Sequence, residues 1–374
     1  YDGSNHVIID RKDFRICLIL VIPPPRRNIG IDLLRVVAAF YAIILHILGV
    51  GGLQVAASGA GQTLLCNALS MWCYCAVNIF GIITGFVSYT EEARPLKLKS
   101  YLRLWGEVVF YNLLLTVLTL WLHPGRARLS SLLFSFFPLL SNKHWYFTVY
   151  TGVFFFIPFL NAAVRSCENR KLLVLLALIV FGFTTLESYL GLFVCNGGYS
   201  FTWLMMLYIV GAILRKSDLG SRIRPTAAFL GILGLFLIAL VMRSLDTWWC
   251  YPLRSESAPV TDSYVFPGHL LIAVLYTVLF AQWQPGRLFR KFAAFAAPGA
   301  FAVYLINTQR YIWYGYMLDH FAPWASLSPL EIGVRVVLAA VVFTLASLVI
   351  DWLRRQLFRC LEKAGKHSCN PAQG

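Results

Sequence analysis

Charged residues are scarce in this chain, and acidic residues are the scarcest of them. Asp, Glu, Lys and Arg make up 13% of its 374 residues, whereas a soluble domain has about 25%. Hydrophobic residues make up 59%. This balance excludes an ordinary soluble domain and indicates a protein that lies in a membrane.

The paired cysteine spacings of metal sites are also absent. The nine cysteines are scattered, several of them within apolar runs, and a single tyrosine separates Cys73 from Cys75. That spacing is too short for a zinc site, so we expect these cysteines to pack between helices. No metal cofactor is expected.

Basic residues give the chain a net charge of +15, which in a soluble protein would suggest nucleic acid. Here the charge instead marks one side of a membrane, and no nucleic-acid partner is expected. Apolar runs predict ten transmembrane helices, at residues 30–49, 65–89, 101–122, 145–163, 172–187, 199–214, 226–242, 265–283, 297–317 and 330–352.

The positions of the lysines and arginines predict the orientation of these helices. With the N-terminus inside, 24 of the 32 lie in the N-terminal segment, the inner loops and the C-terminal tail. Cytoplasmic loops carry such an excess. We therefore predict an all-α, polytopic membrane protein with both termini cytoplasmic and the lipid bilayer as its surroundings. Its parts are a cytoplasmic leader of unknown role (1–27), a transmembrane domain (28–361) and a cytoplasmic tail (362–374).

The first predicted span carries ionisable residues, which are costly within a bilayer and therefore indicate function. Asp32 and Arg35 lie near one end of this span and His46 near the other. Eleven helical steps of about 100° bring Arg35 and His46 to one face, roughly 16 Å apart along the axis. Asp32, three residues before Arg35, is expected to orient the guanidinium.

The orientation places Arg35 near the cytoplasmic surface and His46 near the outer one. A long donor with an anionic head could lie along this face, with its phosphates at Arg35 and its reactive end at His46. Coenzyme A thioesters have such a shape. An acceptor would then approach from outside.

Several stretches in one register resemble a known family. The first span opens with IDLLR (31–35) and has ten residues between Arg35 and His46. Later stretches of the same kind are residues 77–86, 144–161, 198–211, 303–306 and 351–354. Together, from about residue 28 to 361, they resemble the acyltransferase 3 family of integral membrane acyltransferases, and in particular its polysaccharide-modifying members.

The resemblance implies transfer of an acyl group, usually acetyl, from cytoplasmic acyl-CoA to a hydroxyl of an extracytoplasmic glycan at the plasma membrane. The acceptor would be a cell-surface glycan or a lipid-linked saccharide. His46 would be the catalytic histidine, and Arg35 the essential basic residue that binds the donor. Many relatives have a histidine in the ninth span where this chain has Asn307.

Several other polar and aromatic residues are candidates for the site, and some of them also have a purely structural explanation. Lys99 and Arg103 could bind CoA phosphates, although their place on the cytoplasmic side also explains them. Arg310 is predicted in the middle of the ninth span, where it would line the site with Asn307. Trp145 lies at the outer mouth, as a carbohydrate platform or as part of an aromatic belt. Possible sugar partners in the longest outer loop are Trp248, Trp249, Tyr251, Asp246, Glu256 and Asp262.

His46 has two possible roles in such a transfer. Its unperturbed pKa near 6.5 suits a general base that takes the proton from the sugar hydroxyl. It could also carry the acyl group as an acyl-histidine intermediate. Arg310, Asn78 or Asn307 could stabilise the oxyanion. The alternative function is a secondary transporter, or a translocator that passes the acyl group to a separate transferase.

Overall fold

The computed structural model describes residues 27–123, 125, 128–141, 144–249 and 260–368. Within these ranges every regular element is a helix, which confirms the all-α fold. The helices are α1 (Ile29–Leu48), α2 (Leu53–Ala56), α3 (Ala60–Cys73), α4 (Ala76–Ser88), α5 (Leu98–Leu122), α6 (Ser130–Ser135), α7 (Pro138–Ser141), α8 (Trp145–Arg165), α9 (Arg170–Leu190), α10 (Phe201–Lys216), α11 (Leu219–Arg222), α12 (Pro225–Trp249), α13 (Pro267–Gln282), α14 (Arg287–Ala296), α15 (Ala300–Asn307), α16 (Arg310–Ile312) and α17 (Pro329–Ser368).

Eight helical segments in the described part are long and apolar enough to cross a membrane. They are α1, α3 with α4, α5, α8, α9, α12, α14 with α15, and α17. The chain is therefore a polytopic membrane protein. The other two of the ten predicted spans correspond to α10 and α13, which have 16 residues each and fall short of the roughly 20 that a perpendicular crossing needs.

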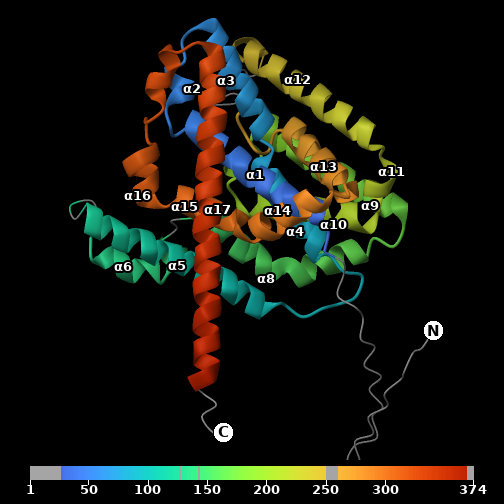
Figure 1. Cartoon of the computed structure of the whole chain (residues 1–374). Coiled ribbons are helices and arrows are strands. Elements are labelled where there is room, and N and C mark those ends of the chain that lie inside the picture. Colours follow the sequence, from blue (N-terminus) through green and yellow to red (C-terminus); the bar gives the residue numbers. More distant parts are fainter. Residues whose placement is uncertain (1–26, 124, 126–127, 142–143, 250–259, 369–374) are drawn as a thin grey trace, which may run out of the picture.

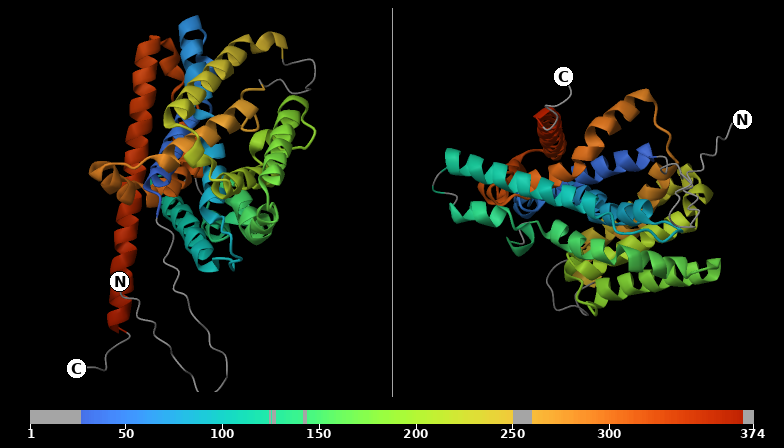
Figure 2. Two further views of the ribbon diagram at one scale, coloured as in Figure 1. Left: turned by 90° about the vertical axis from the view of Figure 1, so that its right-hand side faces the viewer. Right: turned by 90° about the horizontal axis from the view of Figure 1, so that it is seen from below.

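Helix α1 lies in the centre of the bundle, and α17 stands at its edge (Figures 1 and 2). In the most apolar stretch of α1, 61% of the residues are buried, against 33% in α17. Asn28 fixes the start of α1, because its side chain accepts from the amide of Ile31 and donates to the carbonyl of Ala281 in the last turn of α13. A hydrogen bond of 3.0 Å between Tyr41 and Tyr276 joins the same two helices further along.

Helices α4 and α10 approach closely because glycines face each other's backbone. A Cβ atom on Gly85 would lie 1.9 Å from the carbonyl oxygen of Tyr208, and one on Gly211 would lie 2.0 Å from that of Ile82. Any larger residue at either position must push the helices apart.

The predicted ninth span, 297–317, is wrong by about ten residues. The spanning segment runs over Arg287–Asn307 instead, and the chain turns at Thr308 and Gln309. The buried side chain of Gln309 accepts from the amide of Tyr311 at 2.7 Å and so begins α16. A π-helix, Trp313–Met317, follows it. Hydropathy misplaced the span because this aromatic segment is apolar in composition but lines cavities.

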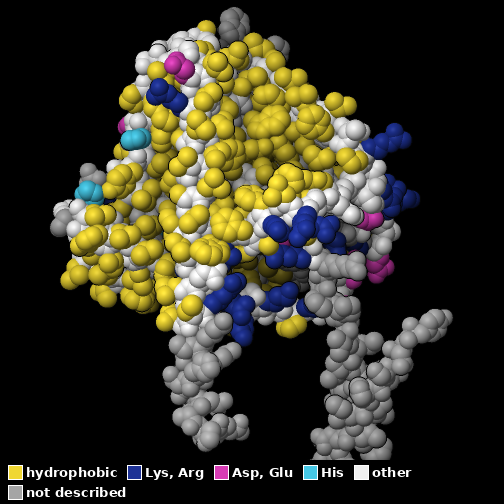
Figure 3. Space-filling model, in the orientation of Figure 1, with side chains coloured by type: hydrophobic (Ala, Val, Ile, Leu, Met, Phe, Trp, Pro, Cys, Tyr) yellow, Lys and Arg dark blue, Asp and Glu magenta, His cyan; other side chains and the backbone are white. Residues whose placement is uncertain are grey.

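The end of the bundle that is predicted to face the cytoplasm is held together by a buried ionic cluster. Asp351 of α17 is fully buried and pairs with both Arg354 and Arg355 at 2.7 Å. Arg354 also reaches Glu107 of α5 at 3.3 Å, and Arg355 donates to the carbonyl of Phe295 at the end of α14. Lysines and arginines gather on the surface near α14 and the lower half of α17, which agrees with the predicted orientation (Figure 3).

Candidate functional site

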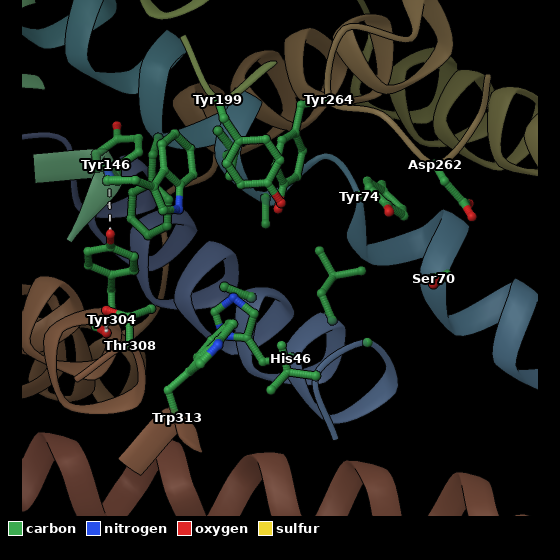
Figure 4. A pocket seen from close by; sticks show the side chains of 18 of the residues that line it. His46, Ser70, Tyr74, Tyr146, Tyr199, Asp262, Tyr264, Tyr304, Thr308 and Trp313 are labelled. Carbon is green, nitrogen blue, oxygen red and sulfur yellow. Dashed lines mark hydrogen bonds between the residues drawn. The ribbon is translucent and has the colours of Figure 1, made fainter. Parts of the chain in front are cut away.

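A cavity of about 780 Å³ opens where α1 ends, and its walls come from both halves of the chain. Trp313 and His46 lie on one side of it, and Tyr199 and Tyr264 lie opposite them (Figure 4). The volume falls in the range of small-molecule sites, which are about 300–1,000 Å³ and combine apolar walls with a few placed polar groups. The cavity lies toward the end of α1 that is predicted to face outside.

His46 reaches this cavity from the last turn of α1, where its side chain is partly buried. Its Nδ1 is hydrogen-bonded to the side-chain oxygen of Asn307 at the end of α15. The indole of Trp313 meets the imidazole edge-on, with ring centres 4.7 Å apart and an interplanar angle of 79°. These two contacts fix the plane of the imidazole ring.

The bond to Asn307 also determines where the imidazole carries its proton. With the amide oxygen toward the ring, Nδ1 is the donor, so in the neutral ring Nε2 holds the lone pair. Among the described residues Nε2 has no hydrogen-bond partner. His46 is therefore arranged as a base whose second nitrogen is available to a ligand.

Aromatic rings form the wall opposite His46. Tyr199 packs against Trp145 at 4.5 Å and against Tyr264 at 5.2 Å between ring centres. Tyr199 lies in the loop before α10, and burial raises the pKa of its phenol above the ordinary value. The phenol is therefore a neutral donor at physiological pH. Tyr304 completes this side by accepting from the amide of Tyr146 at 3.1 Å.

Polar groups line the far end of the cavity. Asp262 faces it and pairs with Arg243 of α12 at 3.0 Å. Ser70 lines the same end and donates to the side chain of Gln54 at 3.3 Å. Asp262 is thus the only one of the predicted loop partners that can be placed among the described side chains. Tyr251 and Glu256 lie outside the described residues, and so do the side chains of Asp246, Trp248 and Trp249.

Arg310 lines the cavity, but it does not lie in the middle of a span as predicted. It is the first residue of α16 and its side chain is exposed. Thr308, in the turn before α16, also lines the cavity and is hydrogen-bonded to the buried His144 at 2.9 Å. His144 in turn contacts Asn112 of α5 at 3.0 Å, so this turn is attached to two neighbouring helices.

Asn307 and Asn78 differ as candidate oxyanion donors. The amide of Asn78 is fully buried and already in use, since it donates to the carbonyl of Tyr264 at 2.8 Å and accepts from Trp203 at 3.1 Å. Asn78 therefore holds two elements together and is unsuited to the predicted role. The amide nitrogen of Asn307 has no partner among the described residues.

Arg35 does not line the cavity but lies about three turns back along α1. Its guanidinium pairs with Asp32 at 3.3 Å, as the sequence predicts, and is one-third exposed. Asp32 also pairs with Arg27. Both arginine side chains are therefore partly accessible at this end of α1.

Lys99 and Arg103 lie on the first turns of α5, exposed and away from the cavity. Glu107, one turn after Arg103 on α5, pairs with Arg354 of α17. Among the described residues, no group of three or more His, Cys, Asp and Glu could hold a metal ion.

Sequence reasoning missed several residues of the cavity wall, namely Trp313, Tyr199, Tyr264, Tyr304 and Tyr74. Tyr199, Tyr264 and Trp313 lie near the ends of predicted spans, where an aromatic belt is the default expectation. Tyr74 and Tyr304 lie further inside predicted spans, where an aromatic residue is expected to pack between helices. One feature of the sequence did indicate the cavity wall: residues 311–316 contain more aromatic residues than one position in an aromatic belt requires.

A central helix with an ion pair at one end and a histidine in an aromatic cavity at the other defines the chain as a polytopic membrane protein with a candidate active site. The family model described as an acyltransferase domain (Acyl_transf_3) matches residues 28–352. The chain therefore belongs to the acyltransferase 3 family and is a membrane acyltransferase. No curated protein and no solved structure matches it.

Proposed function

We propose that this acyltransferase moves an acyl group, in the simplest case acetyl, from cytoplasmic acyl-CoA to a hydroxyl of an extracytoplasmic glycan at the plasma membrane. The observation that carries the proposal is the state of His46. Asn307 and Trp313 hold its ring, and Nε2 is left available in a cavity at the outer end of α1.

Arg35 supports the assignment of the donor. A guanidinium near the cytoplasmic end of α1 can bind phosphate groups through charge-assisted hydrogen bonds. The roughly 16 Å between Arg35 and His46 suits a donor whose charged head and reactive thioester are far apart. Lys99 and Arg103 are exposed on the same side and would attract the anionic head at longer range.

The cavity wall supports the assignment of the acceptor. A sugar presents apolar C–H faces and hydroxyl groups, so it suits aromatic rings with phenols and a carboxylate beside them. Trp145 and Tyr199 would contact its faces, and Asp262 would accept from a hydroxyl. Arg310 would bind from the outer side.

In the proposed reaction, Nε2 of His46 takes the proton of a sugar hydroxyl while that oxygen attacks the thioester carbonyl carbon. The tetrahedral intermediate then collapses, the C–S bond breaks, and the thiolate of CoA receives the proton from the imidazolium. Arg310 or the amide nitrogen of Asn307 would stabilise the oxyanion. General base catalysis by a histidine contributes a factor of about 10² to 10⁴.

The proposal is tested in proteoliposomes that enclose extracted cell-surface glycan and receive labelled acetyl-CoA outside. The wild type should label the glycan, and His46→Gln should lose the activity. His320→Gln is the matched control, because His320 is exposed and does not line the cavity. Labelled glycan with His46→Gln at the wild-type rate would refute the proposal.

The same assay separates the two chemical routes and the alternative function. Label that stays on the protein when the glycan is omitted would replace direct transfer with an acyl-histidine intermediate. Glycan labelling that needs a second, separate transferase would show that this protein is a translocator.

A further inference from the structure

We propose that the acceptor is bound as an oligosaccharide of at least two sugar units, held in two adjoining cavities. The inference rests on the proposed function, because it specifies the size of the acceptor that the same site takes. Its basis is a second cavity that shares two residues with the cavity around His46.

The second cavity has a volume of about 430 Å³. It is lined by Thr119 and His123 at the end of α5, and by Arg310, Tyr311, Tyr314 and Tyr316 of the segment after α15. Arg310 and Tyr314 also line the cavity around His46. The two spaces are therefore neighbours, and a ligand that passes Arg310 and Tyr314 reaches both.

The π-helix Trp313–Met317 supplies side chains to both cavities. Trp313 contacts the imidazole of His46, and three residues later the phenol of Tyr316 is hydrogen-bonded to Nε2 of His123 at 2.8 Å. π-Helical turns are rare in proteins, and those that do occur are often found at functional sites. In this protein the π-helix directs the ring of Trp313 to His46 and the ring of Tyr316 to the second cavity.

The lining of the second cavity suits a neutral, hydroxyl-rich ligand. Tyr314 and Tyr316 are 63% and 49% exposed, so their rings are available for contact without any rearrangement. A hydroxyl, an imidazole and three phenols offer hydrogen bonds. Among the described residues Arg310 is the only cation in this lining, and a phosphate site would be expected to hold several basic groups, so the described lining favours a sugar unit.

The arrangement assigns a position to each unit of the acceptor. The sugar whose hydroxyl reacts lies beside His46, and its neighbour in the glycan lies against Tyr316 and His123. Arg310 and Tyr314 contact the linkage between them. Binding of the second unit would hold the first in register, which reduces the orientational cost of the reaction.

The experiment uses the glycan that the wild type acylates, cut into fragments of one, two and three sugar units. The wild type should have a lower KM for two units than for one, and Tyr316→Ala should abolish that advantage. The loss of one aromatic contact predicts a rise of about three- to tenfold in KM for the two-unit fragment. The one-unit fragment should change by less than about twofold, because it does not reach Tyr316. His123→Ala should show the same pattern.

Trp121→Ala serves as the matched control. Trp121 is 76% exposed, lies two residues before His123 and lines neither cavity, so its replacement should change no KM. Equal KM values of the wild type for all three fragments would overturn the inference while leaving the proposed function intact. An equal loss with every fragment in Tyr316→Ala would also overturn it. A wild type that acylates no glycan refutes the proposed function and this inference together.

Discussion

The side-chain amide of Asn307 is hydrogen-bonded to the imidazole of His46, although 261 positions separate the two residues in the chain. One residue ends α15 and the other lies in the last turn of α1. The contact therefore depends on the packing of the first spanning helix against one near the end of the chain. It gives the catalytic proposal its most direct test.

Asn307→Leu should lower kcat about 10- to 100-fold, because a buried donor on His46 loses its partner and the ring loses its orientation. Asn307→Asp keeps an oxygen at the same place and should retain more of the activity than Asn307→Leu. The measurement is single-turnover transfer from labelled acetyl-CoA. Equal rates for the wild type and Asn307→Leu would show that the contact is only structural.

Arg35→Ala should raise the KM for acyl-CoA about 10- to 100-fold, because a charge-assisted bond to phosphate is lost. Arg35→Lys should recover part of the affinity as a point charge without the forked geometry. Arg94→Ala is the control, since Arg94 is exposed and pairs with Glu92 outside the helices. Unchanged binding of acyl-CoA to Arg35→Ala would contradict the assigned role.

Trp313→Ala should reduce kcat by about three- to tenfold, which corresponds to the loss of one edge-to-face aromatic contact with His46. Trp313→Phe should preserve most of the rate. Trp352→Ala, an exposed tryptophan on α17 away from the cavity, is the matched control. If both alanine variants lose activity equally, the effect belongs to general destabilisation.

Gly211→Ala should destabilise the protein by about 1–3 kcal/mol, because the added Cβ would lie 2.0 Å from a backbone oxygen of α4. Gly182→Ala on α9 meets no atom within 4 Å and should be neutral or slightly stabilising. Thermal unfolding of the detergent-solubilised protein, followed by circular dichroism, compares the two. A Gly211→Ala protein as stable as the wild type would show that the helices separate easily.

The sequence allowed prediction of the features that depend on local spacing. Arg35 and His46 share one helix, so their relation follows from helical geometry, and the pair formed by Asp32 and Arg35 follows from a three-residue spacing. The chain's acyltransferase family and the all-α membrane fold were also predicted and are confirmed.

Contacts between distant segments could not be predicted in the same way. Asn307 was expected near the site, but nothing in the sequence indicates that its oxygen faces Nδ1 of His46. The turn at Thr308 and Gln309 was missed because polar residues in an aromatic run do not lower the mean hydropathy enough to end a span. Arg310 was therefore placed in the middle of a span, whereas it begins the short helix α16.

Helix α17 is 40 residues long, which at 1.5 Å per residue gives about 60 Å, twice the roughly 30 Å of a hydrocarbon core. Asp351, Arg354 and Arg355 anchor it to α5 and to the end of α14. Breaking such buried ion pairs is costly in free energy, so they oppose movement of α17 along its own axis. The 14 residues from Arg355 to Ser368 therefore form a rigid helical extension of about 20 Å beyond this ionic cluster.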